Sequence, residues 1–559
     1  MAETTKERLN KQFAQLESER QSFEPHWREL SDYINPRGSR FLTSEVNRND
    51  RRNTRIIDST GTMAARTLAS GMMSGITSPA RPWFRLATPD PEMMDYGPVK
   101  LWLEAVQNRM NDMFNKSNLY QSLPQLYGSL GTYSTGAMAV LEDDEDIIRT
   151  MPFPIGSYYL ANSPRGSVDT CFRKFSMTVR QLVQEFGLNN VSESVKSMWE
   201  SGTYEKWIEV MHSVYPNIDR DTSKLDSKNK PFKSVYYEVG GDNDKLLRES
   251  GFDEFPIMAP RWEVNGEDVY GSSCPGMLAL GPVKALQLLQ NRKSQLIDKA
   301  TNPPMVAPTS LKNQRASLLP GDITYIDQIT GQDVFRPAYL VNPSTADLVA
   351  DIQDTRQIIN SAYFVDLFMM LQNINTRSMP VEAVIEMKEE KLLMLGPVLE
   401  RLNDECLNPL IDRAFSMMVR KNMLPPPPDV MEGMPLKVEY ISVMAQAQKS
   451  IGLSSLASTV NFIGQLAQAK PEALDKLNVD QAIDAFADMS GVSPTVIVPQ
   501  EQVEQARQQR AQQQQQQQMM AMGMAAAQGA KTLSEAKTSD PSVLSAMANA
   551  VSGQGGQSQ

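Results

Sequence analysis

Two residue types that often carry chemistry are scarce in this chain of 559 residues. It has only two histidines, His26 and His212, so histidine-based metal binding or acid–base catalysis has few candidate groups. Its three cysteines, Cys171, Cys274 and Cys406, stand far apart in the sequence. Their spacing argues against a disulfide framework or a cysteine zinc site, and it favours a reducing compartment. We therefore expect no metal and no other cofactor.

Long apolar runs and phosphate-binding motifs are also missing. No apolar run approaches the roughly 18 residues of a membrane span, and Met1 to Lys6 lacks the apolar core of a signal peptide. We expect a chain made in the cytoplasm, with no membrane partner. Gly131 and Gly136 have the interval of a phosphate-binding loop, but Ala137-Met138 stands where lysine and serine or threonine would be needed. The sequence predicts no nucleotide site.

Positive charge is in deficit, because 55 lysines and arginines face 66 aspartates and glutamates, for a net charge of -11. Proteins that hold nucleic acid tightly use lysine and arginine to replace its counterions. This chain is therefore not expected to grip DNA over most of its surface, although it could surround DNA. Its hydrophobic share of 41% is close to that of globular proteins, so much of the chain should fold.

The stretch that organises the chain runs from Gly281 to Pro380. A helix is predicted from Pro282, which suits an opening turn, to about Ala300, where Asn302-Pro303-Pro304 stops it. Turn signals and short β-prone runs predict a small hairpin-like insert from Met305 to Val341. A second helix follows, with Ser344 as its cap. Each helix would be about 30 Å long, and two such helices cannot bury both faces alone. We interpret the pair as the stem of a ring.

The two stem helices carry opposite charges. The first has Lys284, Arg292, Lys293 and Lys299. The second has Asp347, Asp351 and Asp354, whose spacing places them on one face. These charges could pair between helices of adjacent subunits, which we favour, or the acidic stripe could line a lumen and repel DNA phosphate. The two interpretations are compatible.

The N-terminal half reads as helices followed by a β-rich layer. Helices are predicted over residues 3–34 with a break at Pro25, and over 59–76, 99–119 and 123–132. Strands are predicted over residues 83–86, 137–141, 147–151, 168–175, 208–214, 234–239 and 257–262. We interpret the acidic stretch from Glu142 to Asp146 as a solvated hairpin tip, because a calcium loop would alternate ligands with spacers. The mixed-sign stretch around Arg48, Arg51, Arg52 and Arg55 is interpreted as a salt-bridged surface, with a phosphate or partner contact as the alternative.

Several segments together resemble one known family. The segment from Asp58 through Leu86 is an alanine- and glycine-rich helix that ends in Ser-Pro-Ala-Arg-Pro-Trp-Phe-Arg-Leu. It resembles the portal (head-to-tail connector) proteins of short-tailed bacteriophages. Trp27 to Pro36 is similar to that family's opening helix, and Tyr270 to Gly276 is similar to its turn before the stem. The strongest match is Leu395 to Ile411.

The resemblance implies an α+β, mainly helical portal fold with wing, stem, clip and crown, assembled as a ring with a central channel. The implied regions are residues 1–280, N-terminal helices and β-rich wing; 281–303, first stem helix; 304–343, clip; 344–371, second stem helix; 372–380, tunnel loop; 381–434, kinked wing helix; 435–499, crown; and 500–559, a glutamine-rich barrel or flexible tail. For this last region we expect helix as far as about Ala527 and a flexible tail beyond Gly529.

The resemblance also implies where contacts are made. The tunnel loop would face passing DNA through Asn373, Asn375, Thr376 and Arg377, whose polar, charge-poor chemistry suits sliding. In the clip we select four residues by position and polarity for contact with terminase or tail. They are Lys312, Arg315, Asp327 and Gln328.

The resemblance implies that the protein would be a dodecameric portal at one capsid vertex, present in the virion and in the host cytoplasm during assembly. DNA would be packaged, retained and ejected through it. Its partners would be further copies of itself, the terminase large subunit, tail or adaptor proteins, the major capsid and scaffolding proteins, and double-stranded DNA. It would not be an enzyme, since ATP hydrolysis would belong to the terminase. One alternative is a hydrolase using Asp143 and Asp146, which adjacent positions on a turn do not favour. Another is a scaffolding or adaptor protein without a pore.

Overall fold

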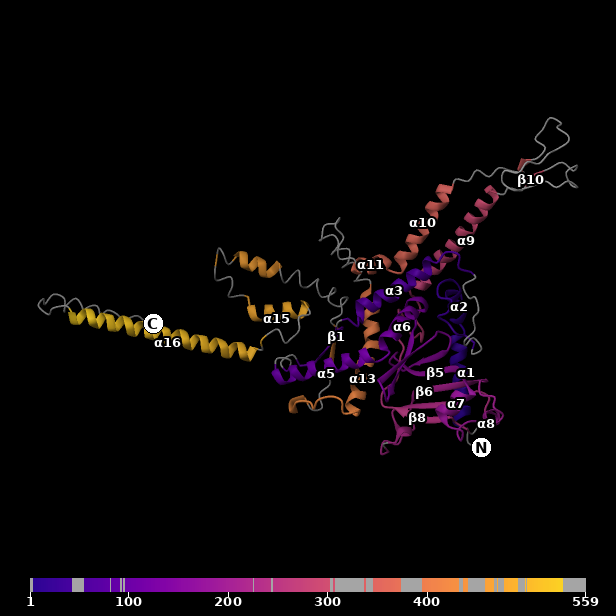
Figure 1. The fold of residues 1–559 in the computed structure, drawn as a ribbon, viewed down its shortest axis with the longest axis horizontal. Helices are drawn as coiled ribbons and strands as arrows, with labels where there is room; N and C mark the ends of the chain where they lie inside the picture. Colours follow the sequence, from indigo (N-terminus) through magenta and orange to yellow (C-terminus); the bar gives the residue numbers. More distant parts are fainter. Residues whose placement is uncertain are drawn as a thin grey trace. The chain divides into compact units, whose positions relative to one another are not determined.

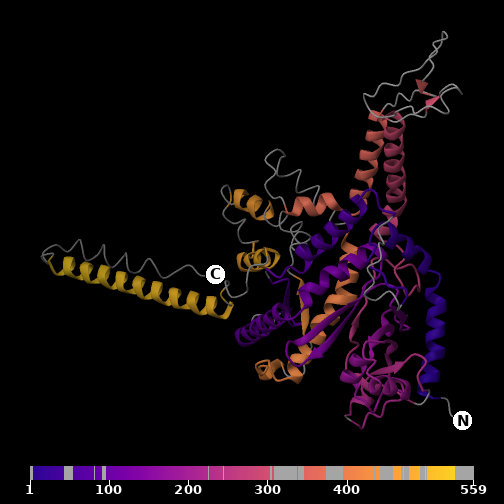
Figure 2. The same ribbon diagram turned by 45° about the vertical axis from the view of Figure 1, so that its right-hand side comes forward.

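The computed structural model describes residues 4–42, 55–80, 82–90, 93, 96–224, 226–242, 245–301, 305–306, 336–337, 345–372, 395–431, 436–440, 458–466, 470, 477–490, 498 and 500–535. The chain falls into two compact units. The first comprises Met1–Pro89 and Leu101–Gly491, and the second comprises Asp90–Lys100 and Val492–Gln559. Figures 1 and 2 show the fold from two directions.

Two helices open the first unit, and the predicted break at Pro25 is confirmed. Helix α1 spans Thr5–Arg20 and begins at a capping box, in which the Thr4 hydroxyl accepts from the Glu7 amide and the Glu7 carboxylate accepts from the Thr4 amide. Helix α2 spans Glu24–Tyr33 with proline in its first turn.

A five-stranded antiparallel sheet forms the β-rich layer. Its strands, in spatial order, are β4 (Tyr158–Asn162), β5 (Val168–Thr178), β6 (Trp207–Pro216), β7 (Phe232–Glu238) and β8 (Arg248–Phe252). Helix α1 packs on one face through Leu9 and Leu16, against Phe172 and Met211. The short helices α7 (Val179–Phe186) and α8 (Glu193–Glu200) pack with Val210, which points to the other face because it neighbours Met211 in β6.

Two smaller sheets complete the β structure. Strands β2 (Ala137–Asp143) and β3 (Ile147–Phe153) form the predicted hairpin, and β9 (Ile257–Met258) joins β2. At the hairpin tip the Asp143 carboxylate accepts from the amides of Glu145 and Asp146, which is the geometry of a turn. Strand β1 (Phe84–Ala87), which was predicted, pairs with β12 (Lys437–Tyr440), although the two strands are far apart in sequence.

Close helix packing depends on small residues. Helices α3 (Thr60–Ile76) and α6 (Leu119–Tyr133) contact each other, and α5 (Gly97–Lys116) precedes α6. A Cβ on Gly131 of α6 would lie 2.3 Å from Leu68 Cδ2 of α3. Gly131 is therefore a packing residue within a helix.

The paired helices differ from the prediction at both ends. Helix α9 spans Pro275–Thr301, so Pro282 lies inside it and Pro275 stands at its start. The predicted start at Pro282 was wrong because both prolines have a φ that fits a helix. Inside the helix, Pro282 lacks only the backbone hydrogen bond to the carbonyl of Leu278, a residue that is exposed. The second predicted rod is two helices, α10 (Thr345–Ala362) and α11 (Val365–Gln372), separated at Phe364 with φ of 54°. Ser344 lies outside the described residues.

Between α9 and α10 the structure describes one short pairing. Strands β10 (Met305–Val306) and β11 (Arg336–Pro337) are antiparallel. They close the segment that the sequence predicted to be a hairpin-like insert, and the residues between them lie outside the described part of the chain.

The next described segment is a helix with a local widening. Residues 395–402 are helical, Asn403–Leu407 form a π-turn, and α13 spans Asn408–Arg420. The π-turn lies just before Pro409, within the segment predicted to be a kinked helix, and it accommodates the missing proline N–H. Arg413 is 1% exposed and donates to the carbonyl of Val140 and to Glu254, which fixes α13 against β2.

The remaining described elements are helical. They are the 3₁₀ turns Ser227–Asn229 and Asp429–Met431, residues 458–466, α15 (Val479–Ser490) and, in the second unit, α16 (Gln500–Glu535). Helix α16 continues beyond Gly529, where a flexible tail was expected, because the alanines around this glycine favour helix. None of the described helices is both long and apolar enough to cross a membrane.

Candidate functional site at the base of the paired helices

Helices α9 and α10 lie side by side in both views of the molecule (Figures 1 and 2). Near the body of the first unit they bury Val283 and Leu286 of α9, and Ile359 of α10. Elsewhere the pair exposes several large apolar side chains, which are Leu288 (49%), Ile297 (46%), Val349 (38%) and Ile358 (56%). A two-helix rod with exposed apolar side chains is incomplete as a packing unit, because such side chains gain free energy when covered.

The carboxylate of Asp58 lies at the base of this pair. Asp58 precedes α3 and is 8% exposed. Its Oδ1 accepts from the Thr60 amide at 2.9 Å and from the Thr60 hydroxyl at 2.5 Å. Its Oδ2 accepts from Gln290 Nε2 of α9 at 2.9 Å and from Arg356 Nη2 of α10 at 2.7 Å. One side chain therefore contacts both helices of the pair and the start of α3.

Hydrogen bonding determines the charge state of this carboxylate. Burial raises the pKa of Asp58, but the hydrogen bonds from Thr60, Arg356 and Gln290 outweigh it and lower the pKa to about 2. Asp58 is therefore ionised at neutral pH and forms an ion pair with the Arg356 guanidinium.

The backbone around Asp58 is held by a second glutamine of α9. Gln287 Oε1 accepts from the amides of Ile57 and Asp58 at 2.6 and 2.8 Å. Gln287 Nε2 donates to the Asp58 carbonyl at 2.9 Å. The side chain of Gln287, which is 6% exposed, thus satisfies three backbone groups at once.

Two further contacts attach α9 to the N-terminal helices. Lys284 Nζ donates to Glu29 of α2 at 2.8 Å, and this hydrogen bond lowers the pKa of Glu29. On α3, a Cβ at Gly61 would lie 2.8 Å from Val283 Cγ2 of α9. Only a glycine permits so close an approach of the two helices.

The predicted stem charges divide into two groups. Lys284 is paired within its own chain, a contact that differs from both the lumen and the intersubunit interpretation. Arg292, Lys299, Asp351 and Asp354 are exposed and Lys293 is half-buried. Within the described residues, no ion pair joins these lysine and arginine side chains of α9 to Asp351 or Asp354. Asp347, also exposed, stands in the first turn of α10. The choice between pairing across subunits and lining a lumen stays open.

The remaining predicted site residues lie outside the described part of the chain. They are the tunnel-loop residues Asn373, Asn375, Thr376 and Arg377, and the clip residues Lys312, Arg315, Asp327 and Gln328. Their roles therefore stay predictions.

The sequence interpretation missed Asp58, Gln287, Gln290 and Arg356 as a group. One signal was available, since Arg356 is the one basic residue in α10 and lies among three aspartates. The partner Asp58 is 298 residues away, and nothing in the local pattern connects the two.

The contacts around Asp58 couple the positions of three helices, α3, α9 and α10. Buried polar contacts with good geometry fix the directions of α3, α9 and α10 relative to one another. Among the described residues, no group of three or more His, Cys, Asp or Glu side chains could hold a metal ion. The three cysteines are buried, which raises the pKa of each thiol to about 12 and makes them poor nucleophiles.

Comparisons with known proteins cover nearly the whole chain. Residues 6–498 match a family described as bacteriophage head to tail connecting protein. The portal protein of Salmonella phage epsilon15 is 80% identical over 550 residues, which are 98% of this chain and 99% of that protein. The probable portal protein of Bordetella phage BPP-1 is 44% identical over 554 residues, 99% of this chain and 100% of that protein. A solved neck of an empty GTA particle, computed with C6 symmetry, aligns with a TM-score of 0.35 and 12% identity over 72% of this chain and 86% of that chain.

Proposed function

The chain belongs to the bacteriophage head to tail connecting protein family, and from this premise we propose that it is the portal protein of a short-tailed phage. It is a structural component of the virion at the connection of head and tail. In our proposal it forms a ring at one capsid vertex. Viral DNA enters through the channel of this ring during packaging, is retained there, and leaves through it during ejection.

One observation carries the proposal. The 80% identity to a portal protein extends over 98% of the chain, so the stem, the insert and the C-terminal part are included as well as the folded body. The paired helices supply independent physical support. Their exposed apolar side chains, among them Leu288 and Ile358, require covering, and neighbouring copies arranged around an axis would cover them.

We assign the regions of a portal as follows. The paired helices α9 and α10 are the stem, and the segment between them, closed by β10 and β11, is the clip that contacts terminase and tail proteins. The five-stranded sheet with α1, α7 and α8 is the wing. Residues 372–380 form the tunnel loop, and residues 435–499 the crown.

The finer partner assignments belong to the same proposal. The ring contains twelve copies, the terminase large subunit docks on the clip during packaging, and tail or adaptor proteins replace it afterwards. The hydrolysis of ATP belongs to the terminase. The acidic balance of this chain, -11, suits a channel that surrounds DNA without gripping it.

Electron microscopy of the purified full-length chain in negative stain tests the proposal. We expect ring-shaped particles with a central hole. Compact monomers, or oligomers without a hole, would contradict it. The second outcome would favour an adaptor or scaffolding protein without a pore, the alternative that shares the virion location.

A further inference from the structure

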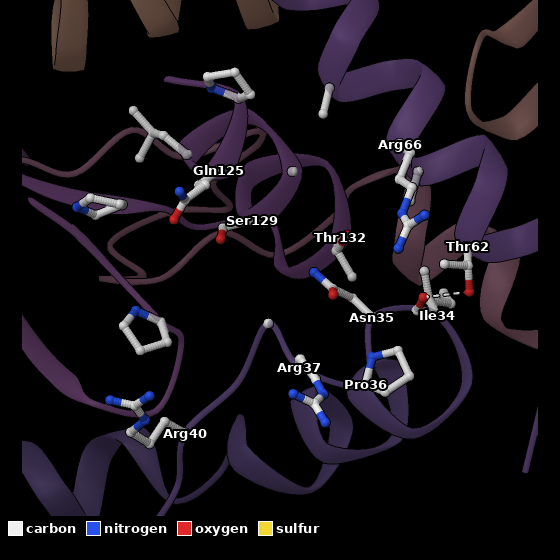
Figure 3. Close-up of a pocket in the computed structure, with 18 of the residues that line it drawn as sticks. Ile34, Asn35, Pro36, Arg37, Arg40, Thr62, Arg66, Gln125, Ser129 and Thr132 are labelled. Carbon is white, nitrogen blue, oxygen red and sulfur yellow. Dashed lines mark hydrogen bonds between the residues drawn. The ribbon is translucent and has the colours of Figure 1, made fainter. Parts of the chain in front are cut away.

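The first unit contains a cavity of about 990 Å³ between α3, α6 and the segment that follows α2. Figure 3 shows it with Thr62 and Arg66 of α3 on one side, Gln125 and Ser129 of α6 on another, and the segment that carries Arg37 and Arg40 below. The cavity is much larger than a single water site, so it has room for side chains of another molecule.

The lining of this cavity is positive. The described residues that line it include four arginines, Arg37, Arg40, Arg66 and Arg173, and neither aspartate nor glutamate is among them. Within the described residues, Arg40 and Arg66 form no side-chain ion pair, and Arg66 is exposed. In a chain with a net charge of -11, four arginines around one cavity are a marked local excess.

One of the four arginines, Arg173, has a buried donor atom without an acceptor among the described residues. Its Nε is buried and has no hydrogen-bond partner among the described residues, while its guanidinium lies 4.3 Å from the ring of Phe153 and 4.4 Å from the ring of Phe175. Burial lowers the pKa of Arg173 to about 10, and the charge of Arg40 acts in the same direction. Arg173 therefore remains protonated at neutral pH, and an anion in the cavity would relieve its repulsion with Arg40.

The same hairpin that borders the cavity carries an acidic tip at its other end. Ala137 and Phe153 line the cavity and are paired in register, and Asp143 and Ile147 are the last pair before the tip. Six residues of strand separate the two ends by about 20 Å. The tip of a chain therefore cannot enter the cavity of that chain.

The acidic tip presents carboxylates to solvent. Asp144, Glu145 and Asp146 are exposed, and the side chain of Asp144 is fully exposed with Lys421 Nζ 4.0 Å away. Glu145 and Asp146 form no ion pair with any described residue. Arg420 binds Glu142 at 2.7 Å and attaches the root of the tip to α13, so the carboxylates project from a fixed base.

We propose that the arginine-lined cavity of each copy receives Glu145 and Asp146 of a neighbouring copy. The proposal rests on the ring of the proposed function. In a ring, one surface of each copy contacts a different surface of the next copy. The cavity and the tip are two such surfaces, because they have opposite charge and lie at the two ends of one hairpin. Two carboxylates between several arginines would form charge-assisted hydrogen bonds shielded from water.

Charge exchange between two variants tests the contact. The cavity variant Arg40→Glu/Arg66→Glu and the tip variant Glu145→Lys/Asp146→Lys are each expected to need at least tenfold higher protein concentration for half-maximal ring formation. Mixing the two full-length variants before assembly should restore rings. In an alternating ring each acidic tip then meets an arginine cavity, and each lysine tip meets an acidic cavity. Matched controls are Arg220→Glu and Glu200→Lys, exposed residues away from both surfaces, which should assemble normally.

The readout is particle mass in solution, by mass photometry or sedimentation, with thermal unfolding of each variant measured separately. Rescue by mixing would exclude misfolding as the cause of the loss. Normal assembly of either variant alone, or failure of the mixture, would overturn the contact. Loss of binding to a labelled oligonucleotide with assembly intact would also overturn it, because the cavity would then bind phosphate. Absence of rings from the wild-type chain would instead contradict the proposed function.

Discussion

Arg356 Nη2 lies 2.7 Å from Asp58 Oδ2, and this ion pair joins two residues that are 298 positions apart. It connects the segment before α3 to α10, the second of the paired helices. The hydrogen bonds of Gln287 and Gln290 extend the contact to the first helix. A rotation of either stem helix would break buried polar contacts, so the stem and α3 should move together.

Removing this carboxylate should destabilise the first unit. Asp58→Ala leaves Arg356 and Gln290 without their shared acceptor, and we expect the free energy of unfolding to fall by about 2–4 kcal/mol. The measurement is urea denaturation followed by circular dichroism. Asp219→Ala is the matched control, because Asp219 forms an exposed ion pair with Arg8 at 3.5 Å that should contribute less than about 1 kcal/mol. Equal effects of the two substitutions would contradict the role of Asp58.

The same carboxylate should make stability depend on pH in the acid range. Its pKa is about 2 in the folded chain, below the ordinary value of 3.8, so the folded state favours the ionised form. The resulting stability is complete above pH 3.8 and is lost as the pH falls toward 2. We expect wild type to exceed Asp58→Asn by about 2 kcal/mol at pH 6, with the difference shrinking below pH 4. Urea denaturation at a series of pH values measures it, and a difference that is independent of pH would contradict the assignment.

Replacing Gly71, a glycine at the contact between α3 and α11, should lower the stability of the fold. A Cβ on Gly71 would lie 2.2 Å from ring atoms of Phe368, so Gly71→Ala requires a shift of the helix or the ring and should cost about 1–3 kcal/mol. Gly128→Ala is the control, since its Cβ would lie 3.8 Å from Ala69 and the change should raise stability by up to about 1 kcal/mol. Thermal unfolding of both variants gives the comparison. A Gly71→Ala protein as stable as Gly128→Ala would show that the helices can separate at no cost.

Local signals predicted the helices and hairpins well. Helix α7 carries such signals at both ends, since Thr178 caps its start and Gly187 follows its last residue. Strand β8 was missed because Arg248 and Gly251 interrupt any apolar alternation, which is tolerated in an edge strand with one neighbour. The break at Phe364 was missed because a phenylalanine with positive φ has no sequence signature.

Contacts between residues far apart in the chain could not be predicted from the sequence pattern. Two of the resembling segments pack on each other, since the ring of Trp27 in the opening helix lies 5.1 Å from the ring of Tyr270 in the turn before α9. Their spacing in the sequence gives no hint of this. The sequence likewise gives no sign that Asp58 and Arg356 form an ion pair, because the tertiary fold determines which charges lie close together.

The unpaired charges of the stem should act between subunits. If Asp351 and Asp354 pair with Arg292 and Lys293 of an adjacent copy, Asp351→Lys/Asp354→Lys should weaken ring formation, and adding Arg292→Glu/Lys293→Glu should restore it. Mass photometry at low and high salt measures both. Asp366→Lys, an exposed aspartate in the first turn of α11, is the control. Intact assembly of the first variant would favour the acidic stripe as a lining of the lumen.

The last prediction separates architecture from DNA handling. Deleting Asn373 to Ser378 removes the polar segment that we assign to the tunnel loop, with its one cationic side chain, Arg377. Rings should still form, because the contacts that hold α3, α9 and α10 together lie outside the deleted segment. Packaging or retention of DNA should be impaired, since transient contacts with phosphate are lost. Particle imaging measures the first effect and nuclease-protected DNA per particle measures the second. A deletion that abolishes rings would show that the loop holds the assembly together, because loss of a DNA contact alone cannot dissociate subunits that assemble without DNA.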